Sequence, residues 1–225
     1  MTSPIHKLEV KNLQCTRGDR ELFTNLSFQL ENKQLMMLEG QNGSGKTTLL
    51  RSLCGLYEAD HGEILWDNEP IKKQDELYRR NLLYLGHLNA IKPDLTVLEN
   101  LRINTSLAGE QVTDTQLMEA LDEIGLYAFE DFPARQLSQG QKRRVALARL
   151  LVSQAKLWVL DEPFVALDVA AVEHLQMIIA KHVERGGMVI LTTHQEVPLT
   201  SSEIKRLSLN KKTSDSIKVG ENANG

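Results

Sequence analysis

Three short apolar runs stand out along the chain, LMML (35–38), LWVL (157–160) and MVIL (188–191). Their apolar residues follow one another without polar residues in between, which is typical of strands buried on both faces of a parallel sheet. We therefore predict that these runs are the central strands of a mainly parallel sheet in an α/β protein.

The first part of the chain has a different pattern. LEVKNLQC (8–15) and FTNLSFQL (23–30) alternate apolar with polar residues, as half-exposed strands do. GEILWDNEPI (62–71) is predicted as a further strand that ends in a turn. We expect these segments to form an antiparallel β layer at one edge of the fold.

Between about residues 88 and 155 the strand pattern gives way to helix starts. Capping boxes, in which a Thr is followed three residues later by Glu or Gln, occur at Thr96/Glu99 and Thr113/Gln116. The second box begins a helix whose apolar residues share one face, namely Leu117, Leu121 and Ile124. This region is therefore predicted to be helical.

These patterns predict one domain with an insertion. Residues 1–87 and 156–209 would form the α/β core with its antiparallel layer, and residues 88–155 an inserted helical subdomain. A length of 225 residues, with 41% hydrophobic and 25% charged residues, suits this organisation. The polar tail NKKTSDSIKVGENANG (210–225) is rich in Gly and Asn, so we expect it to be disordered.

Composition and charge disfavour several classes of protein. No apolar run is longer than four residues and the start MTSPIHK is polar, so we expect neither a spanning helix nor a secretory signal, and a cytoplasmic location. The net charge of −4 and the pI near 5.9 provide no general attraction to nucleic acid. Cys15 and Cys54 lack a metal-ligand spacing, so both are predicted as small core residues.

The segment EGQNGSGKTTLL follows LMML and fits the pattern GxxxxGK[ST]. A glycine-rich turn is the alternative, but a strand before it and a helix after it favour a phosphate-binding loop. Backbone amides then wrap the β-phosphate, Lys46 supplies charge to the β and γ oxygens, and Thr47 supplies a hydroxyl ligand to Mg²⁺. The expected phosphate-binding residues are Gly40, Asn42, Gly43, Ser44, Gly45, Lys46, Thr47 and Thr48.

Polar side chains also follow the other two buried strands. Asp161 and Glu162 come after LWVL, where carboxylates point into the crevice in which α/β sheets bind ligands. Asp161 is then placed to hold Mg²⁺ and Glu162 to polarise an attacking water. His194, after MVIL, could donate to a γ-phosphate oxygen and hold Glu162 and the water in register. An ordinary loop position is the alternative for each of them.

The stretch LSQGQ (137–141) precedes the helix KRRVALARLLV. A capping box explains Ser138 and Gln141. It does not explain Gly140, because glycine in the first turn weakens a helix by about 1 kcal/mol relative to alanine. We therefore expect another group to approach the backbone at Gly140.

Several other polar and aromatic residues have ordinary explanations. The run Lys142, Arg143 and Arg144 is expected on a solvated face, with contact of one of them to a partner's nucleotide as the alternative. Two histidines on the helix of residues 169–185 are expected in surface or packing roles, and both tryptophans in the core, namely His174, His182, Trp66 and Trp158.

The phosphate loop, LSQGQ, LWVLDEP, VALD (165–168) and TTH (192–194), in this order, resemble the nucleotide-binding domain of ABC ATPases over about residues 5–209. The resemblance implies an α/β fold of the P-loop NTPase type with the antiparallel layer and the helical insertion described above. It also implies hydrolysis of ATP with Mg²⁺, with Lys46, Glu162 and His194 as the catalytic residues and Thr47 and Asp161 as metal ligands.

The same resemblance implies a head-to-tail homodimer. Ser138, Gly140 and Gln141 of one chain would bind the γ-phosphate that the partner chain holds with its own phosphate loop. ATP would then close the dimer and its hydrolysis would open it. Asp168 would couple the two sites across the dimer.

Two positions depart from the family pattern. The family usually has an aromatic residue near position 17 that stacks on adenine, whereas this chain offers Arg17, whose guanidinium plane could stack instead, or Phe23. The family usually has a glutamine where this chain has His87, at the position that senses Mg²⁺ and the attacking water and contacts the membrane partner. A histidine there would make hydrolysis depend on pH.

YLGHLNAIKPDLTVLENL (84–101), RRVALARLL and the compact length are similar to the ATP-binding subunits of cytochrome c maturation systems, often described as haem exporters. The likeness implies the membrane partners CcmB and CcmC, docked near His87 and the helical subdomain. It also implies a peripheral location on the cytoplasmic face of the inner membrane. Transport of haem and ATP-driven release of a haem-loaded periplasmic chaperone are both compatible with it.

Two other classes stay as alternatives. One is a soluble ABC ATPase without a membrane partner, such as an Fe–S cluster assembly ATPase, and co-purification with membranes or with cytosol would separate the two. The DNA-repair and translation-factor types are disfavoured, because the chain shows no coiled-coil heptads, second cassette or basic tail. A nucleoside or small-molecule kinase would share only the phosphate loop and would have no use for LSQGQ.

Overall fold

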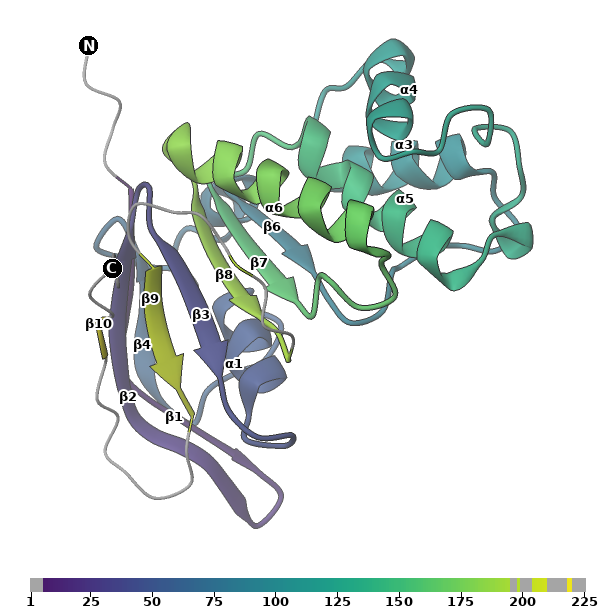
Figure 1. Cartoon of the computed structure of the whole chain (residues 1–225). Helices are drawn as coiled ribbons and strands as arrows, with labels where there is room; N and C mark the ends of the chain where they lie inside the picture. The colour runs from purple at the N-terminus through teal and green to yellow at the C-terminus, as the bar shows by residue number, and fades with distance from the viewer. Residues whose placement is uncertain (1–5, 195–197, 199–203, 210–217, 220–225) are drawn as a thin grey trace, which may run out of the picture.

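The strands form two sheets in the computed structural model of the chain, which describes residues 6–194, 198, 204–209 and 218–219 (Figure 1). The antiparallel sheet has the order β2 (Arg20–Glu31), β1 (Lys7–Arg17), β4 (His61–Trp66) and β5 (Glu69–Pro70). The second sheet has the order β10 (Lys218–Val219), β9 (Ile204–Ser208), β3 (Leu35–Glu39), β8 (Met188–Thr192), β7 (Leu157–Asp161) and β6 (Leu82–Leu85). Strands β9 to β6 of this sheet are parallel.

The helices lie around the second sheet and to one side of it (Figure 1). They are α1 (Lys46–Leu53), α2 (Asp75–Arg80), α3 (Val97–Leu107), α4 (Asp114–Glu123), η1 (Ala134–Gln136), α5 (Gln139–Val152) and α6 (Val169–Glu184). Helices α3, α4 and α5 pack on one another, and all three lie within residues 88–155. None of the described helices is long and apolar enough to cross a membrane.

The predicted α/β fold is confirmed. The three apolar runs are β3, β7 and β8, which are neighbours in the parallel sheet. The two alternating segments are β1 and β2 of the separate antiparallel sheet, and GEILWDNEPI contains β4 and β5 of the same sheet. The capping boxes at Thr96, Thr113 and Ser138 each form with both of their hydrogen bonds. The sequence analysis missed β6, β9 and α2. Strand β6 is short and only half-buried, and β9 is largely polar.

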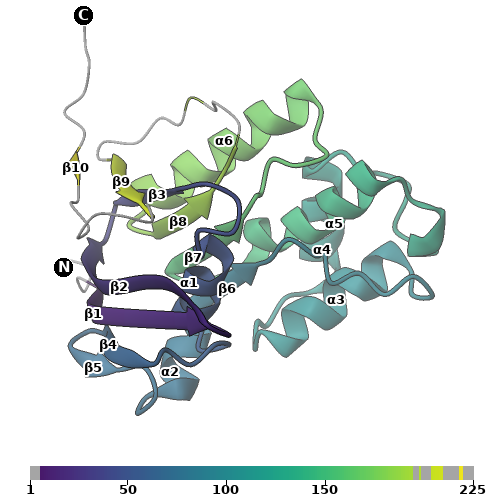
Figure 2. The same cartoon turned by 90° about the horizontal axis from the view of Figure 1, so that it is seen from below.

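Alternate residues of β3 belong to two different cores. Met36 and Leu38 face α1 and the antiparallel sheet, whereas Leu35 and Met37 face the side of α5 and α6. Figure 2 shows α1 between the antiparallel sheet and the parallel strands. The first core contains both cysteines, so the prediction that Cys15 and Cys54 are buried core residues is confirmed.

The predicted disorder of residues 210–225 is wrong for two of them. Lys218 and Val219 form β10, whose backbone pairs antiparallel with Arg206 and Lys205 of β9. The rest of this tail lies outside the described residues.

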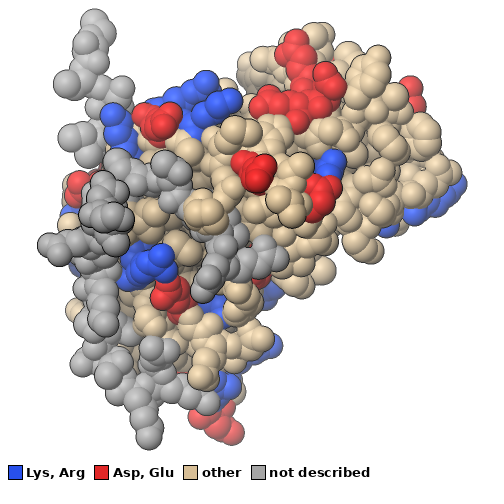
Figure 3. All heavy atoms as spheres, in the orientation of Figure 1, with Lys and Arg blue, Asp and Glu red and all other residues tan. Residues whose placement is uncertain are grey.

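The face of the molecule in Figure 3 carries charges of both signs, and a group of acidic side chains lies over its helical part. No broad basic surface is seen in this view. This face therefore agrees with the expectation drawn from the net charge.

The parallel order places three loops at one edge of the sheet. The glycine-rich loop follows β3, Glu162 follows β7, and Thr193 and His194 follow β8, which lies between the other two strands. Carboxyl ends of parallel strands meet at the same edge, where α/β folds bind ligands. The sequence motifs that lie far apart along the chain are gathered there.

Candidate functional site

The loop between β3 and α1 leaves little space for a side chain at two of its glycines, Gly40 and Gly45. A Cβ at Gly40 would lie 2.6 Å from Ser44 Oγ and 2.8 Å from the carbonyl oxygen of Leu209. Gly45 precedes α1 with a φ of 107°, a conformation that residues with side chains rarely adopt. The backbone amides and the N-terminus of α1 are therefore free to converge on an anion.

Two buried polar side chains belong to this loop and to the first turn of α1. Lys46 is only 8% exposed, and its Nζ donates to the carbonyl oxygens of Gly40 at 2.6 Å and Gln41 at 3.3 Å. Ser44 is also buried, and its Oγ has no hydrogen-bond partner in the described part of the chain. A buried hydroxyl without a hydrogen-bond partner costs free energy. A phosphate oxygen in the loop would accept a hydrogen bond from this hydroxyl and remove that cost.

Asp161, the last residue of β7, is buried and held by two hydroxyl groups. Its Oδ2 accepts a hydrogen bond from Thr47 Oγ1 at 2.9 Å, and its Oδ1 accepts one from Thr192 Oγ1 at 2.8 Å. The carboxylate is thus fixed beside the first turn of α1. Thr47 and Asp161 present the hard oxygen atoms that Mg²⁺ prefers, with phosphate oxygens needed to complete its coordination.

Glu162 follows Asp161 and contacts the third strand end. Its Oε1 lies 3.2 Å from Nε2 of His194, and its backbone amide donates to Thr192 Oγ1 at 2.9 Å. Its φ is 51°, in the left-handed region that is uncommon for a residue with a side chain. Such backbone outliers are held in place by surrounding contacts and cluster at functional sites, which favours a chemical role for this residue.

A cavity of about 680 Å³ lies at this edge of the sheet, and the predicted phosphate-loop residues Gly40 and Ser44 are not among the described residues that line it. Most of the predicted site residues contribute to its wall, namely Arg17, Asn42, Gly43, Gly45, Lys46, Thr47, Thr48, His87, Asp161, Glu162 and His194. The structure therefore brings together the phosphate loop, both carboxylates and the two histidines in one cavity. Its volume is in the range of small-molecule and cofactor sites.

The hairpin between β1 and β2 covers one side of this cavity. Arg17 lines it, whereas Phe23 is buried against Gly45 in the core and cannot present a ring to a ligand, which excludes this residue as the stacking partner. Arg20, which the sequence analysis missed, donates from Nη2 to the carbonyl oxygen of Gly43 at 2.8 Å. It anchors the hairpin to the phosphate loop, and no sequence motif marked it.

Ser138, Gly140 and Gln141 lie at the start of α5, and none of them is among the described residues that line this cavity. Ser138 Oγ accepts from the Gln141 amide at 3.2 Å, and Gln141 Oε1 accepts from the Ser138 amide at 2.9 Å. The capping box is therefore confirmed, while a role of these residues at a nucleotide requires a second chain.

An approach to the backbone at Gly140 comes from the same chain. A Cβ at this position would lie 3.0 Å from the carbonyl oxygen of Ala166, which itself has a left-handed φ of 64°. Close packing against the loop of residues 162–168 therefore explains why this position holds glycine, before any partner is considered.

Asp168 links that loop to two helices. Its Oδ1 accepts from the amide of Ala171 at 2.9 Å and caps α6, and its Oδ2 accepts from Arg144 Nη2 of α5 at 2.5 Å. The pair is partly exposed, with 25% exposure for the Arg144 side chain and 62% for that of Asp168. Asp168 thus fixes the geometry between α5 and α6 at the molecular surface.

Arg143 is a correction to the sequence analysis, which expected a solvated face for residues 142–144. Its side chain is 3% exposed and hydrogen-bonds to the loop after β6 and to the end of β7. The helix turns this residue inward between Lys142 and Arg144, each of which is only partly buried. A run of basic residues on a helix does not reveal which of its members faces inward.

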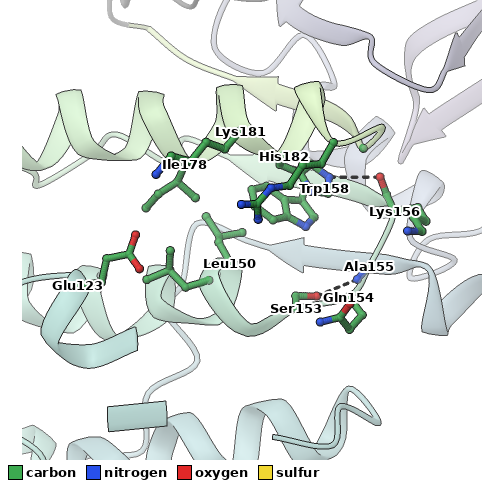
Figure 4. Close-up of a pocket in the computed structure, with 13 residues that line it drawn as sticks. Glu123, Leu150, Ser153, Gln154, Ala155, Lys156, Trp158, Ile178, Lys181 and His182 are labelled. Carbon is green, nitrogen blue, oxygen red and sulfur yellow. Dashed lines mark hydrogen bonds between the residues drawn. The ribbon is translucent and has the colours of Figure 1, made fainter. Parts of the chain in front are cut away.

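A second cavity, of about 360 Å³, lies between α6 and the segment that joins α5 to β7 (Figure 4). On its wall the His182 ring stacks on Trp158, with 3.7 Å between ring centroids and 6° between planes. Burial lowers the pKa of His182 to about 4. The packing role predicted for His182 and the core positions of Trp66 and Trp158 are confirmed, and His174 lies 3.6 Å from a Glu123 oxygen.

Comparisons with known proteins point to one family. The family model described as ABC transporter matches residues 23–165. A cytochrome c biogenesis ATP-binding export protein, CcmA, of Nitrosomonas europaea is 54% identical over 207 residues, which cover 92% of this chain and 97% of that protein. The proteins of that name in Haemophilus influenzae and Escherichia coli K12 are 48% and 49% identical over 91% and 90% of this chain, and 95% and 96% of their own lengths are covered.

Solved structures show the same fold. An ATP-binding protein of Pyrococcus furiosus, assigned to an ABC transporter, superposes with a TM-score of 0.78 at 27% identity and covers 92% of this chain and 100% of its own. An ATP-binding cassette in a dimeric post-hydrolysis state, with ADP and Pi bound, superposes with a TM-score of 0.79 at 23% identity, over 93% of this chain and 98% of its own.

Proposed function

We propose, from the premise that this chain belongs to the ABC transporter family of ATP-binding proteins, that it hydrolyses ATP to power a membrane export complex in cytochrome c biogenesis. The observation that carries the enzymatic part is the set of contacts from Thr47 through Asp161 and Thr192 to Glu162 and His194. The biological part is supported by the relatives that are 48–54% identical over nearly the full chain.

Binding of the ATP phosphates falls to the loop and to α1. Lys46 Nζ would exchange its carbonyl partners for β and γ oxygens, and Ser44 Oγ would donate its unused hydrogen bond. Thr47 and Asp161 would hold Mg²⁺, which supplies positive charge against the phosphate oxygens when bound. Because Thr192 fixes Asp161, the ligand oxygens are positioned before the nucleotide arrives.

Hydrolysis itself requires a base beside the γ-phosphate. Glu162 would accept a proton from water as the water oxygen bonds to the γ-phosphorus, while the bond to the bridging oxygen breaks and ADP leaves. His194, 3.2 Å from Glu162 Oε1, would orient that carboxylate and donate to a γ-phosphate oxygen. Arg17 on the hairpin would stack its guanidinium plane on adenine, because it lines the cavity and Phe23 does not.

The site would be completed by a second copy of the chain in a head-to-tail dimer. Ser138, Gly140 and Gln141 lie at the N-terminus of a 14-residue helix, whose positive end attracts the γ-phosphate of the partner's ATP. A dimeric solved structure of the same fold supports this assembly. ATP would then strengthen the interface and hydrolysis would weaken it.

The membrane partners would be CcmB and CcmC, which would contact the chain near His87 at the cytoplasmic face of the inner membrane. His87 is exposed and, together with the exposed Leu88, lines a third hollow, of about 620 Å³, beside the nucleotide cavity. An apolar residue in a hollow beside the nucleotide cavity suits a docking segment of a partner. The cargo moved would be haem, or haem released with its periplasmic chaperone.

Complementation tests this proposal. A strain that lacks the gene would regain covalently haem-bearing c-type cytochromes, measured by haem staining, when it receives the wild-type chain. The Lys46→Ala chain should restore no c-type cytochromes because it no longer binds ATP. The Glu162→Gln chain should also restore none, because its ATP turnover falls by about 100-fold or more although it still binds ATP. Restoration by Lys46→Ala would contradict the requirement for ATP, and failure of the wild-type chain would contradict the role in cytochrome c biogenesis.

A further inference from the structure

Arg143 is a buried cation that lines the hollow of about 620 Å³ beside the nucleotide cavity. Its Nη1 donates to the carbonyl oxygen of Gly86 at 3.2 Å and to Asn89 Oδ1 at 3.0 Å. Its Nη2 donates to the carbonyl oxygen of Glu162 at 2.6 Å and to that of Asp161 at 3.3 Å, and its Nε donates to Pro163 at 3.3 Å. One guanidinium therefore joins three segments, namely α5, the loop 86–89 and the end of β7.

The partners of Arg143 are neutral. All five acceptors are backbone carbonyl or side-chain amide oxygens, and no ion pair joins Arg143 to a carboxylate within the described ranges. Burial lowers the pKa of Arg143, and the nearby Asp161 and Glu162 carboxylates raise it. Arginine stays charged in proteins, so a fixed cation lies next to the two acidic residues of the site.

The guanidinium is planar, so its two ends cannot move independently. One end holds the loop that carries His87, and the other holds the carbonyl of Glu162, whose backbone is in the left-handed region. His87 and Glu162 also line both the nucleotide cavity and the hollow beside it. A displacement of the loop would therefore either break the Nη1 bonds or shift the backbone at Glu162.

We propose that Arg143 is a positioning residue that ties the loop 86–89 to Glu162, so that the rate of ATP hydrolysis depends on where this loop lies. The proposal rests on the proposed function, because it requires that Glu162 is the base in ATP hydrolysis. It adds a route by which anything that contacts the loop from outside would change catalysis without touching the nucleotide.

Steady-state ATP hydrolysis by the full chain tests the proposal. Arg143→Gln should lower kcat by about 10-fold to 100-fold, because small displacements of a catalytic group cost this much, and leave KM within about twofold. Arg143→Lys should recover part of the loss, because an ammonium keeps the charge but not the planar fork. Arg79→Gln is the matched control, because Arg79 forms only an exposed ion pair with Asp75 on α2, and should behave as wild type.

A folded Arg143→Gln chain with wild-type kcat would overturn the proposal, and so would a loss seen only as a rise in KM. If Arg143→Gln does not fold, as judged by its thermal unfolding, Asn89→Ala decides. That variant keeps Arg143 and removes one acceptor on the loop, so kcat should fall severalfold at unchanged KM, and a wild-type kcat would overturn the proposal.

Two variants distinguish a failure of the proposed function from a failure of the link through Arg143. Wild-type turnover by Glu162→Gln would refute the base assigned under the proposed function. An inactive Glu162→Gln together with a fully active Arg143→Gln would leave that function intact and refute only the link through Arg143.

Discussion

Nε2 of His194 lies 3.2 Å from Oε1 of Glu162, across the carboxyl ends of the neighbouring strands β8 and β7. The two residues are 32 positions apart in the sequence, and the parallel register of the two strands brings them together. The contact connects the proposed base to the proposed γ-phosphate donor in one cavity.

His194→Ala should therefore lower kcat by about 100-fold while ATP binding is kept, because the histidine would act on the γ-phosphate and the base rather than on the rest of the nucleotide. Phosphate release and a titration with fluorescent ATP measure the two quantities. His174→Ala serves as the control, because His174 lies outside the cavity and beside Glu123. Equal turnover by both variants would contradict the role of His194.

Asp161→Asn should abolish the effect of Mg²⁺ on nucleotide affinity. The wild-type chain should bind ATP at least about 10-fold more tightly with Mg²⁺ than without it, since Thr47 and Asp161 supply the metal ligands. The variant should bind ATP equally well in both conditions. Calorimetric titrations with and without Mg²⁺ measure these ATP affinities. If Mg²⁺ increases the affinity of the variant as much as that of the wild-type chain, the ion is held elsewhere.

Gly140→Ala should leave the monomer folded and able to bind ATP but weaken ATP-dependent dimerisation by about 10-fold or more. The methyl group would press on the Ala166 carbonyl oxygen at 3.0 Å and shift the loop that leads to Asp168. Better helix propensity would offset part of the cost, by about 1 kcal/mol. Analytical ultracentrifugation with ATP, in a Glu162→Gln background, measures the dimerisation. Dimerisation as strong as without the Gly140→Ala change would show that residue 140 does not fit tightly against the Ala166 carbonyl oxygen.

His182 should make the protein less stable in mild acid. Its pKa of about 4 in the folded chain lies below the usual 6.5, so the unfolded chain binds the extra proton between these values. The contribution of His182 to the free energy of unfolding is complete above about pH 6.5 and is lost as the pH falls toward 4, by about 3 kcal/mol at most.

Urea unfolding at pH 7 and pH 5 measures that loss. His182→Phe keeps an aromatic ring against Trp158 and removes the titration, so the variant should lose less stability between the two pH values than the wild-type chain. The same loss in both proteins would show that other groups cause the acid sensitivity.

Much of the site could be predicted from the sequence because its residues follow strands that have a clear pattern. The runs LMML, LWVL and MVIL fix three neighbouring strands, and the phosphate loop, Asp161 with Glu162, and His194 come after them in turn. The parallel arrangement then leaves one edge of the sheet at which these residues can meet.

Contacts that depend on side-chain direction could not be predicted. Arg143 and Arg20 make their hydrogen bonds through long flexible side chains, and neither stands at a motif position that specifies a partner. The close approach of Ala166 to Gly140 could not be predicted either, because Ala166 lies in a loop whose path the sequence does not reveal. Strand β6 was missed because four half-buried residues carry too little periodicity.

The central claim is that one ATP molecule is held between the phosphate loop of one chain and Ser138 and Gly140 of another. A mixture of two defective chains tests it, one with Lys46→Ala and one with Ser138→Arg, both in a Glu162→Gln background that prevents turnover. A mixed dimer would contain one intact site, formed by the loop of the second chain and the α5 start of the first.

The direct measurement is the amount of ATP that stays bound through gel filtration. The Lys46→Ala chain alone should retain none because it does not bind ATP, and the Ser138→Arg chain alone should lose its ATP during the run because only one chain holds the nucleotide. The mixture should retain up to one ATP per mixed dimer. A mixture that retains no more ATP than the separate variants would contradict the shared site.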